Sequence, residues 1–310
     1  MAISTTVDMS DVKLQLVDEM FLMELDATAI ANQFASMAIQ DAKGSWKVPI
    51  FDNMAVPASA LGENALTSAA LVKQGARAIE FNPVKESAGV AHTEESEIVT
   101  NGQINDAAAL NVGRTAGKVK GLRATQALDA NIATAGGYAI QADANLVIDT
   151  GAIDVDTITG TDLYSYATAK KARAHLENME AELFDGQYYF ALAHTDVIED
   201  LKEDTKWQDK AKYAQPEQLK TGEVGALNGI RYIRNPQATK VANVGTVDVY
   251  RTHVFGVNAF GVANDKLETL IVKPIPDDLS ESQYYNAYKM FIEYKIVMRD
   301  ALVTVLSAAS

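Results

Sequence analysis

Residues 222–236 read GEVGALNGIRYIRNP, a run in which three glycines precede a short apolar segment that Asn235 and Pro236 close. Glycine clusters can cradle phosphates, but such a loop joins a strand to a helix and carries a Lys-Ser or Lys-Thr pair. Here a strand pattern follows the glycines, and no such pair is present. Asn228–Gly229 is instead a turn dipeptide. We therefore expect this stretch to reverse the chain into a strand at 230–233.

The composition around this stretch is that of a globular protein. The chain has 310 residues, of which 48% are apolar and 22% charged, which is enough for one large or two small cores. Its net charge of −14 argues against a nucleic-acid reader. The absence of cysteine excludes disulfides, thiolate metal sites and thiol nucleophiles. We see neither a signal-peptide pattern nor an apolar run of about 18 residues, so we expect synthesis in the cytoplasm and no membrane span.

Apolar periodicity predicts helices and strands along the rest of the chain. Mixed three- and four-residue spacings favour one or two helices between Val12 and Ile39. Residues 105–134 contain no proline and favour one helix, about 45 Å long. The other expected elements are a helix at 161–184 capped by Thr161, a buried strand in QYYFALAHT (187–195), a short helix in DVIEDLKED (196–204), and strands at 230–233, 247–257, 270–272 and 288–298. After a turn at Arg299–Asp300, the segment ALVTVLSA is expected to pair with strand 288–298 as a hairpin.

The segment between Gly44 and Val84 has a different pattern. Two short apolar runs, WKVPIF and RAIEF, flank a stretch of small and turn-forming residues. This pattern predicts a long two-stranded excursion. Its tip lacks apolar residues large enough for a core of its own, and a two-stranded ribbon is marginal alone.

The long helix carries two unusual features. Gly113, Gly117 and Gly121 fall four residues apart on one face, and each costs about 0.8–1.0 kcal/mol of helix propensity relative to alanine. We expect close approach of another backbone to offset that cost. The helix also carries four cations and no acid between Asp106 and Asp129: Arg114, Lys118, Lys120 and Arg123. These cations either pair with acids of the same or another chain, or face a polyanion.

Residues with catalytic or metal-binding chemistry do not form a recognisable motif. His194 ends the buried strand, where active-site residues often lie in open sheets, but no nucleophile elbow accompanies it. With Asp196 beside it, capping of the following helix is the simpler role. His92, His175 and His253 lack metal-ligand spacing. We therefore predict no catalytic residue, no metal and no cofactor.

In this order of elements the chain resembles the major capsid proteins of tailed bacteriophages with the Hong Kong 97-like fold. The similarity covers most of the chain and is most specific in two motifs: a strand end that reads "His/Pro-x-Asp-Val-x-x-Leu", and a turn that reads "Gly-Glu-x-Gly-x-x-x-Gly-x-Arg". The matching residues are His194, Asp196 and Val197 in the first motif, with Leu201 one position beyond its leucine, and Gly222, Glu223, Gly225, Gly229 and Arg231 in the second.

The resemblance implies an α+β subunit divided into four parts. These are an N-terminal arm (1–43), an extended loop called the E-loop (44–84), a peripheral P-domain (85–155 and 271–310) with a spine helix at 105–134, and an axial A-domain (156–270). The E-loop would bury its apolar residues on an adjacent subunit. Its candidate contacts are Trp46, Val48, Ile50, Phe51, Leu66 and Leu71.

The function implied is that of a coat subunit forming hexamers and pentamers of an icosahedral virion capsid, assembled in the host cytoplasm. The implied partners are the subunit itself, a portal, scaffolding or decoration proteins, and packaged double-stranded DNA contacted non-specifically. The arm begins almost at residue 1, so a scaffold would be a separate protein. Two alternatives stay open: an encapsulin-type nanocompartment shell, and an α/β hydrolase-like enzyme using His194.

Overall fold

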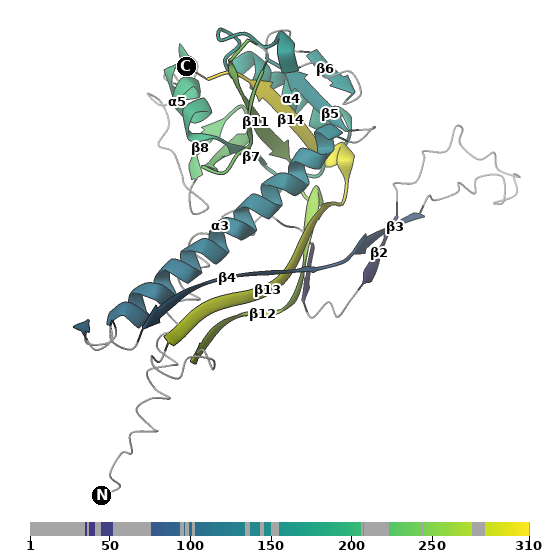
Figure 1. Cartoon of the computed structure of the whole chain (residues 1–310). Helices are drawn as coiled ribbons and strands as arrows, with labels where there is room; N and C mark the ends of the chain where they lie inside the picture. The colour runs from purple at the N-terminus through teal and green to yellow at the C-terminus, as the bar shows by residue number, and fades with distance from the viewer. Residues whose placement is uncertain are drawn as a thin grey trace, which may run out of the picture.

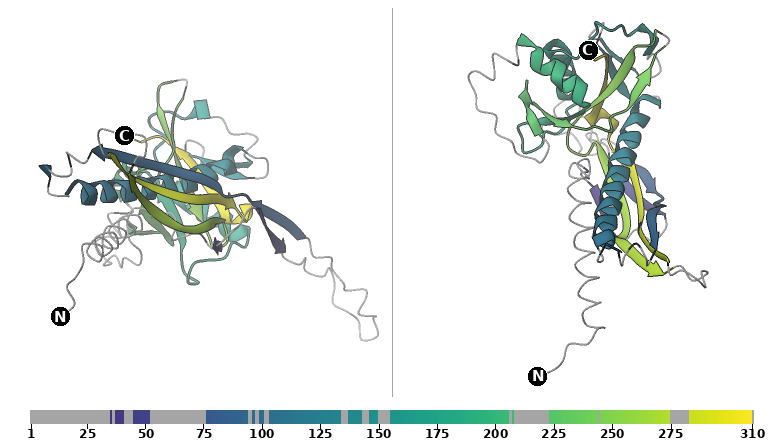
Figure 2. Two further views of the ribbon diagram at one scale, coloured as in Figure 1. Left: turned by 60° about the horizontal axis from the view of Figure 1, so that its bottom comes forward. Right: turned by 60° about the vertical axis from the view of Figure 1, so that its left-hand side comes forward.

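The chain folds around two β-sheets and one long helix (Figure 1). A computed structural model describes residues 35, 37–40, 45–51, 76–93, 96, 99–100, 103–133, 137–142, 146–149, 155–205, 207, 223–243, 245–274 and 283–309. Figure 2 shows one sheet with its helices at one end of the molecule and the other sheet at the opposite end, with helix α3 (Gln103–Ala133) alongside both. Within the described residues, no helix combines the length and the apolarity needed to cross a bilayer.

A four-stranded sheet forms one end of the molecule. Its strands run in the order β1 (Met37–Gln40), β12 (Phe260–Pro274), β13 (Gln283–Ile296) and β4 (Val84–Thr93). Strand β13 confirms the predicted alternation, because Tyr288, Met290 and Ile292 are buried in one cluster with residues of α3. Met37 and Ile39 were expected in a helix, and this is wrong. Both lie in β1, which pairs in parallel with β12, so tertiary pairing overrides local periodicity.

A larger sheet forms the other end. Its strands are β6 (Leu146–Asp149), β5 (Tyr138–Gln141), β14 (Leu302–Ser307), β11 (Asp248–Phe255), β7 (Tyr189–Ala193), β9 (Ile230–Arg234) and β8 (Glu223–Leu227) in that order, with β10 (Lys240–Ala242) on β11. All five residues of β7 are buried, as predicted for a strand covered on both faces.

The C-terminal strand corrects the predicted hairpin. The chain does turn at Arg299–Ala301, in a short 3₁₀ helix, η5. However, β14 pairs with β11 and β5 in the larger sheet, and not with β13. All six residues of β14 are buried, which a central strand satisfies and a solvent-facing hairpin does not.

The helices agree in position with the prediction, and one differs in length. Helix α3 matches the expected 105–134 within two residues, and α5 (Thr195–Glu203) matches the short charged helix. Helix α4 spans only Tyr166–Asn178, capped by Ser165 and not by Thr161. It ends early because Glu180 has a φ of 55°, a left-handed conformation that no α-helix continues through. A further 3₁₀ turn, η4, spans Val155–Thr157.

The expected two-stranded excursion is present. Strands β2 (Trp46–Phe51) and β3 (Ala76–Phe81) pair antiparallel, and Figures 1 and 2 show them extending away from both sheets. The tip between Phe51 and Ala76, and the N-terminal helices expected before Met37, lie outside the described residues.

Candidate functional site

The base of the β2–β3 ribbon is fixed to its own chain. Ile50 is 8% exposed and Phe81 0% exposed, in a small apolar cluster with Ala263 and Val297. Nη2 of Arg77 donates to the carbonyl of Val297 at 3.1 Å. Its own chain therefore already covers most of Ile50, which leaves little of this side chain for the expected contact with another subunit.

The other E-loop candidates differ in exposure. Val48 is half-buried against the same cluster, whereas Trp46 is 49% exposed and is the large apolar side chain that the ribbon offers to solvent. The side chain of Phe51, and Leu66 and Leu71, lie outside what the structure describes.

Polar contacts further fix the ribbon. Nζ of Lys295 on β13 donates to the carbonyl oxygen of Glu80 at 2.6 Å, and the backbone N–H of Asn82 donates to the carboxylate of Glu293. The pKa of the exposed Glu80 carboxyl is lowered, mainly by a hydrogen bond from Ser45 and next by the positive charge of Lys47. The direction of the ribbon is thus set by contacts within the chain.

The four cations of α3 do not form one stripe. Arg114 and Lys118 are exposed, but Lys120 is only 4% exposed. Residues 118 and 120 point to nearly opposite sides, because each helical residue adds about 100° of rotation. Arg123 forms an ion pair with Glu86 on β4, with Nη2 and Oε1 separated by 2.6 Å. Pairing within the same chain thus accounts for Arg123, and we call the exposed residues Arg114 and Lys118 the exposed basic pair.

One face of α3 lies along the segment that follows the quoted motif. Gly113, Gly117 and Gly121 are all buried. A Cβ atom added at Gly121 would overlap the side-chain amide of Gln237. The expected close approach is therefore present at Gly121, although it is made by a side chain and not by a backbone.

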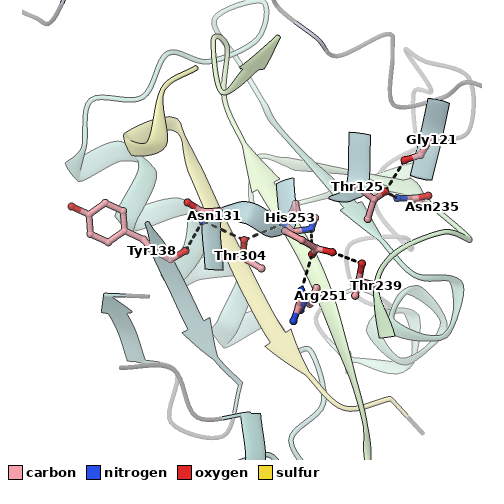
Figure 3. Close-up of polar contacts among 10 residues, drawn as sticks. Gly121, Thr125, Asn131, Tyr138, Asn235, Thr239, Arg251, His253 and Thr304 are labelled. Carbon is pink, nitrogen blue, oxygen red and sulfur yellow. Dashed lines mark hydrogen bonds and ion pairs between the residues drawn. The ribbon is translucent and has the colours of Figure 1, made fainter. Parts of the chain in front are cut away.

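Two further residues continue this face at four-residue steps. Nδ2 of Asn235 donates to Oγ1 of Thr125 at 3.0 Å, and the hydroxyl of Thr239 donates to Asp129. We call Gly121, Thr125 and Asp129 the docking stripe of α3. Figure 3 shows Thr125 beside Asn235, and Thr239, Arg251 and His253 grouped together.

Asp129 is the charged member of the docking stripe. Its Oδ1 atom lies 3.2 Å from Nε2 of His253 and 3.4 Å from Nη1 of Arg251, both on β11. Burial by itself raises the pKa of Asp129, but the hydrogen bond and charge of His253, with Thr239 and Arg251, outweigh burial and lower it. Oγ1 of Thr304 lies 3.1 Å from Nδ1 of His253. His253 appeared isolated in the sequence, and no sequence spacing could have linked it to Asp129.

The first family-like motif has a structural role. The backbone N–H of Asp196 donates to Nδ1 of His194 at 3.2 Å, which caps α5 as predicted. The hydroxyl of Tyr250 donates to Asp196 at 2.8 Å. No group of three or more potential metal ligands occurs within the described part of the chain.

The second family-like motif forms a hairpin turn. Asn228 and Gly229 have φ values of 52° and 71°, the left-handed pair that a two-residue hairpin turn requires. Arg173 donates to the carbonyl of Asn228 at 2.9 Å and occupies the space where a side chain at 229 would lie. The turn joins β8 to β9 as expected.

The remaining residues of that motif pack locally. Gly225 lies at a bulge in β8 against the ring of Trp207. Arg231 is 4% exposed and lies 4.0 Å from the ring centroid of Tyr188. Glu223 begins β8, and Gly222 lies outside the described residues.

Comparison with known proteins identifies the fold. No model of a protein family and no curated protein sequence matches the chain. Solved structures do match. The capsid of Ralstonia phage GP4 has a TM-score of 0.67 at 10% identity, covering 87% of this chain and 85% of that one. The head of Helicobacter pylori bacteriophage KHP40 has a TM-score of 0.60 at 11% identity, covering 88% and 86%.

A virus-like particle from Pyrococcus furiosus also matches, with a TM-score of 0.54 at 8% identity, covering 94% of this chain and 99% of that one. Each of these three matches covers at least 85% of both chains. The chain therefore has the Hong Kong 97-like fold found in the major capsid proteins of tailed phages.

Proposed function

We propose that the chain is the coat subunit of a tailed-phage head, forming hexamers and pentamers of an icosahedral shell. The observation that carries this proposal is the structural match to a phage capsid protein, which covers 87% of the chain with a TM-score of 0.67. The subunit acts as a building block and has no catalytic role. It is a component of the virion, assembled in the host cytoplasm.

The ribbon of β2 and β3 supports this proposal physically. Its base is anchored by Ile50, Phe81 and Arg77 to its own chain, and it extends away from both sheets (Figure 2). A two-stranded ribbon is marginally stable alone. A neighbouring subunit supplies the missing apolar partner, and Trp46, half exposed at the base, is the described side chain available to it. Leu66, Leu71 and Phe51 belong to the same proposal.

The exposed basic pair Arg114 and Lys118 suits a partner of opposite charge. In a chain of net charge −14, acids of adjacent subunits are abundant. Packaged double-stranded DNA is the other proposed partner, contacted without sequence preference through its phosphates. A portal and scaffolding or decoration proteins complete the proposed set of partners.

We propose a domain division that follows strand pairing and differs from the expected one, in which 85–155 and 271–310 were peripheral and 156–270 axial. Strand β12 enters the four-stranded sheet at Phe260, and β5, β6 and β14 pair within the larger sheet. The peripheral domain would then comprise β4, α3, β12 and β13. The axial domain would comprise the larger sheet with α4 and α5, and β1 would join the N-terminal arm to the peripheral sheet.

A nanocompartment shell of the encapsulin type is the second candidate. It is favoured by the match to the Pyrococcus furiosus particle, of which 99% is covered. Such a shell uses the same subunit fold but encloses protein. The contents of the particle distinguish the two functions.

Electron microscopy of the purified full chain tests the shared part of the proposal. We expect uniform shells or ring-shaped capsomers, and a dispersed monomer under every assembly condition would contradict it. Particles from the natural source separate the candidates. Nuclease-protected double-stranded DNA supports the phage head, whereas a co-purifying protein cargo without protected DNA supports the nanocompartment.

A further inference from the structure

The docking stripe includes one carboxylate, that of Asp129, on the helix that joins the four-stranded sheet to the larger sheet. Helix α3 packs on β13 and β4 of the four-stranded sheet and reaches β14 and β5 of the larger sheet. Asp129 lies in the part of α3 that reaches the larger sheet. Its side chain is 12% exposed, and that of His253 is 1% exposed. An ionised group in such a position must be compensated by partners.

The partners of Asp129 are a cation and two hydrogen-bond donors. Arg251 carries a permanent positive charge, and His253 presents Nε2 to the same oxygen atom, Oδ1. Since a carboxylate only accepts hydrogen bonds, Nε2 of His253 carries a proton. Thr239 donates to the other carboxylate oxygen. Among the described residues, no second carboxylate takes part in this cluster.

The side of His253 remote from Asp129 is also enclosed. Its Nδ1 atom faces the hydroxyl of Thr304, which lies 3.3 Å from Nδ2 of Asn131 on α3. Nδ2 of Asn131 in turn donates to the carbonyl of Tyr138 at 3.1 Å. The cluster thus joins α3 to β11, β14 and β5, as Figure 3 shows.

Protonation of Asp129 would remove the electrostatic attraction in this contact. The neutral carboxyl no longer attracts Arg251, and the permanent charge of Arg251, whose side chain is 21% exposed, is left without its anion. A partly buried charge without a partner destabilises the contact around it. The contact that attracts at neutral pH therefore becomes unfavourable in acid.

The other part of α3 is held by contacts that depend little on pH. Val112 and Ala116 belong to the apolar cluster that contains Met290 and Ile292 of β13. Apolar burial is insensitive to protonation. Ala124 and Leu128 belong to this cluster too, so these apolar contacts keep the helix attached in acid, and only the polar contacts of the end nearest Asp129 would loosen.

We propose that Asp129, with His253 and Arg251, is an acid-operated joint that fastens α3 to the larger sheet at neutral pH and releases it in acid, while α3 stays packed on the four-stranded sheet. The lowered pKa of Asp129 agrees with this proposal, because it places release below the ordinary titration range of a carboxyl group. The joint is a property of the single chain and does not depend on the proposed shell function.

Hydrogen–deuterium exchange of the purified full chain, resolved by peptide and corrected for the intrinsic effect of pH, tests the joint. Between pH 7.5 and about pH 2, below the ordinary carboxyl range, we expect residues 124–133 to lose protection at a higher pH than residues 106–118. In Asp129→Asn, which keeps the side-chain volume but removes the charge, residues 124–133 should exchange about tenfold faster or more at pH 7.5. In this variant, the exchange of residues 124–133 should also depend less on pH than in the wild type.

Glu86→Gln is the matched control. It removes the ion pair with Arg123, which links α3 to the four-stranded sheet, and it should leave the exchange of residues 124–133 unchanged. If both parts of α3 lose protection at the same pH, or if Asp129→Asn matches the wild type, the joint does not exist. Should Asp129→Asn fail to fold, Arg251→Gln is the second variant, because the Arg251 side chain is 21% exposed. It should move the release of residues 124–133 to higher pH, and an unchanged release pH would overturn the proposal.

Discussion

Arg123 on α3 and Glu86 on β4 form an ion pair of 2.6 Å between helix and sheet. The Arg123 side chain is 44% exposed and that of Glu86 22% exposed, and Nη1 of Arg123 also donates to Gln126 at 2.8 Å. This ion pair connects Arg123 to the four-stranded sheet. Arg114 and Lys118 have the same charge but lie on an exposed face of the helix. The three cations therefore have different expected effects on stability and assembly.

We expect Arg123→Gln to lower the free energy of unfolding by up to about 1 kcal/mol, because exposed ion pairs contribute little. The Arg114→Gln/Lys118→Gln double variant should change subunit melting by no more than an exposed ion pair does, because both side chains are exposed, but it should reduce shell yield or DNA retention. Thermal melting and quantitative electron microscopy measure the two effects. Reduced melting in the double variant would show that these two cations act within the subunit.

The ribbon supplies a matched pair of apolar substitutions. Ile50→Ala should destabilise the subunit by about 2–5 kcal/mol, since it opens a cavity beside Phe81 and Val297. Trp46→Ala should change the stability of the isolated subunit by less than about 0.5 kcal/mol, because the side chain is half exposed. If Trp46 contacts a neighbour, its loss should impair assembly. Denaturant titration and particle counts check both variants, and normal shells from Trp46→Ala would argue against an intersubunit role.

Local patterns were the part of the fold that sequence could predict. The alternation in β13, the proline-free helix α3 and the turn at Asn228–Gly229 each depend on residues close in sequence, and each is present. The partner of β14 depends on strands far away in sequence, and its prediction was wrong. The end of α4 depends on the left-handed backbone at Glu180, which no periodicity indicates.

The candidate site shows the same division. Capping by His194 could be predicted because donor and acceptor lie two residues apart. The contact of Asp129 with His253 spans 124 residues and joins a helix to a strand of another unit. Lys120 differs from Lys118 only in which side of α3 it lies on, and the packing of that side depends on distant strands. Such contacts follow from the tertiary fold and not from spacing.

His194 should affect stability through capping alone. His194→Ala removes the acceptor for the Asp196 N–H and should cost about 0.5–2 kcal/mol. His194→Asn should retain most of the stability, because asparagine is a good helix cap. Chemical denaturation of both variants measures the difference. Equal destabilisation by alanine and asparagine would show that packing on Tyr250, not capping, is the main contribution.

Gly89 on β4 is expected to tolerate no side chain. A Cβ atom there would lie 2.6 Å from Cβ of Ala287 and 2.7 Å from the carbonyl oxygen of Asn286 on β13. Because backbone atoms would have to move, Gly89→Ala should destabilise the subunit by about 1–3 kcal/mol. Gly160→Ala is the control, since no atom of a described residue other than its chain neighbours lies within 4 Å of its added Cβ, and it should be neutral or slightly stabilising. A shift of the urea midpoint in Gly160→Ala as large as that in Gly89→Ala would contradict this account.

The contribution of Asp129 to stability should depend on pH in a defined direction. Its pKa is lower in the folded chain than its ordinary value, so the unfolded chain takes up a proton first as the pH falls. The stabilisation is therefore fully present above the ordinary carboxyl pKa of about 3.9 and is lost as the pH falls through the lower folded value. Relative to Asp129→Asn, we expect the wild type to be more stable by about 1–3 kcal/mol at pH 7, and this difference should shrink towards pH 3. Denaturant titrations of both proteins at several pH values measure it.

Asp248→Asn is the control, because Asp248 forms an exposed ion pair with Lys240, and its effect should stay within about 0.5 kcal/mol at each pH. A difference for Asp129→Asn that grows as the pH falls would mean that the folded chain favours the protonated carboxyl, against the contacts with Arg251 and His253.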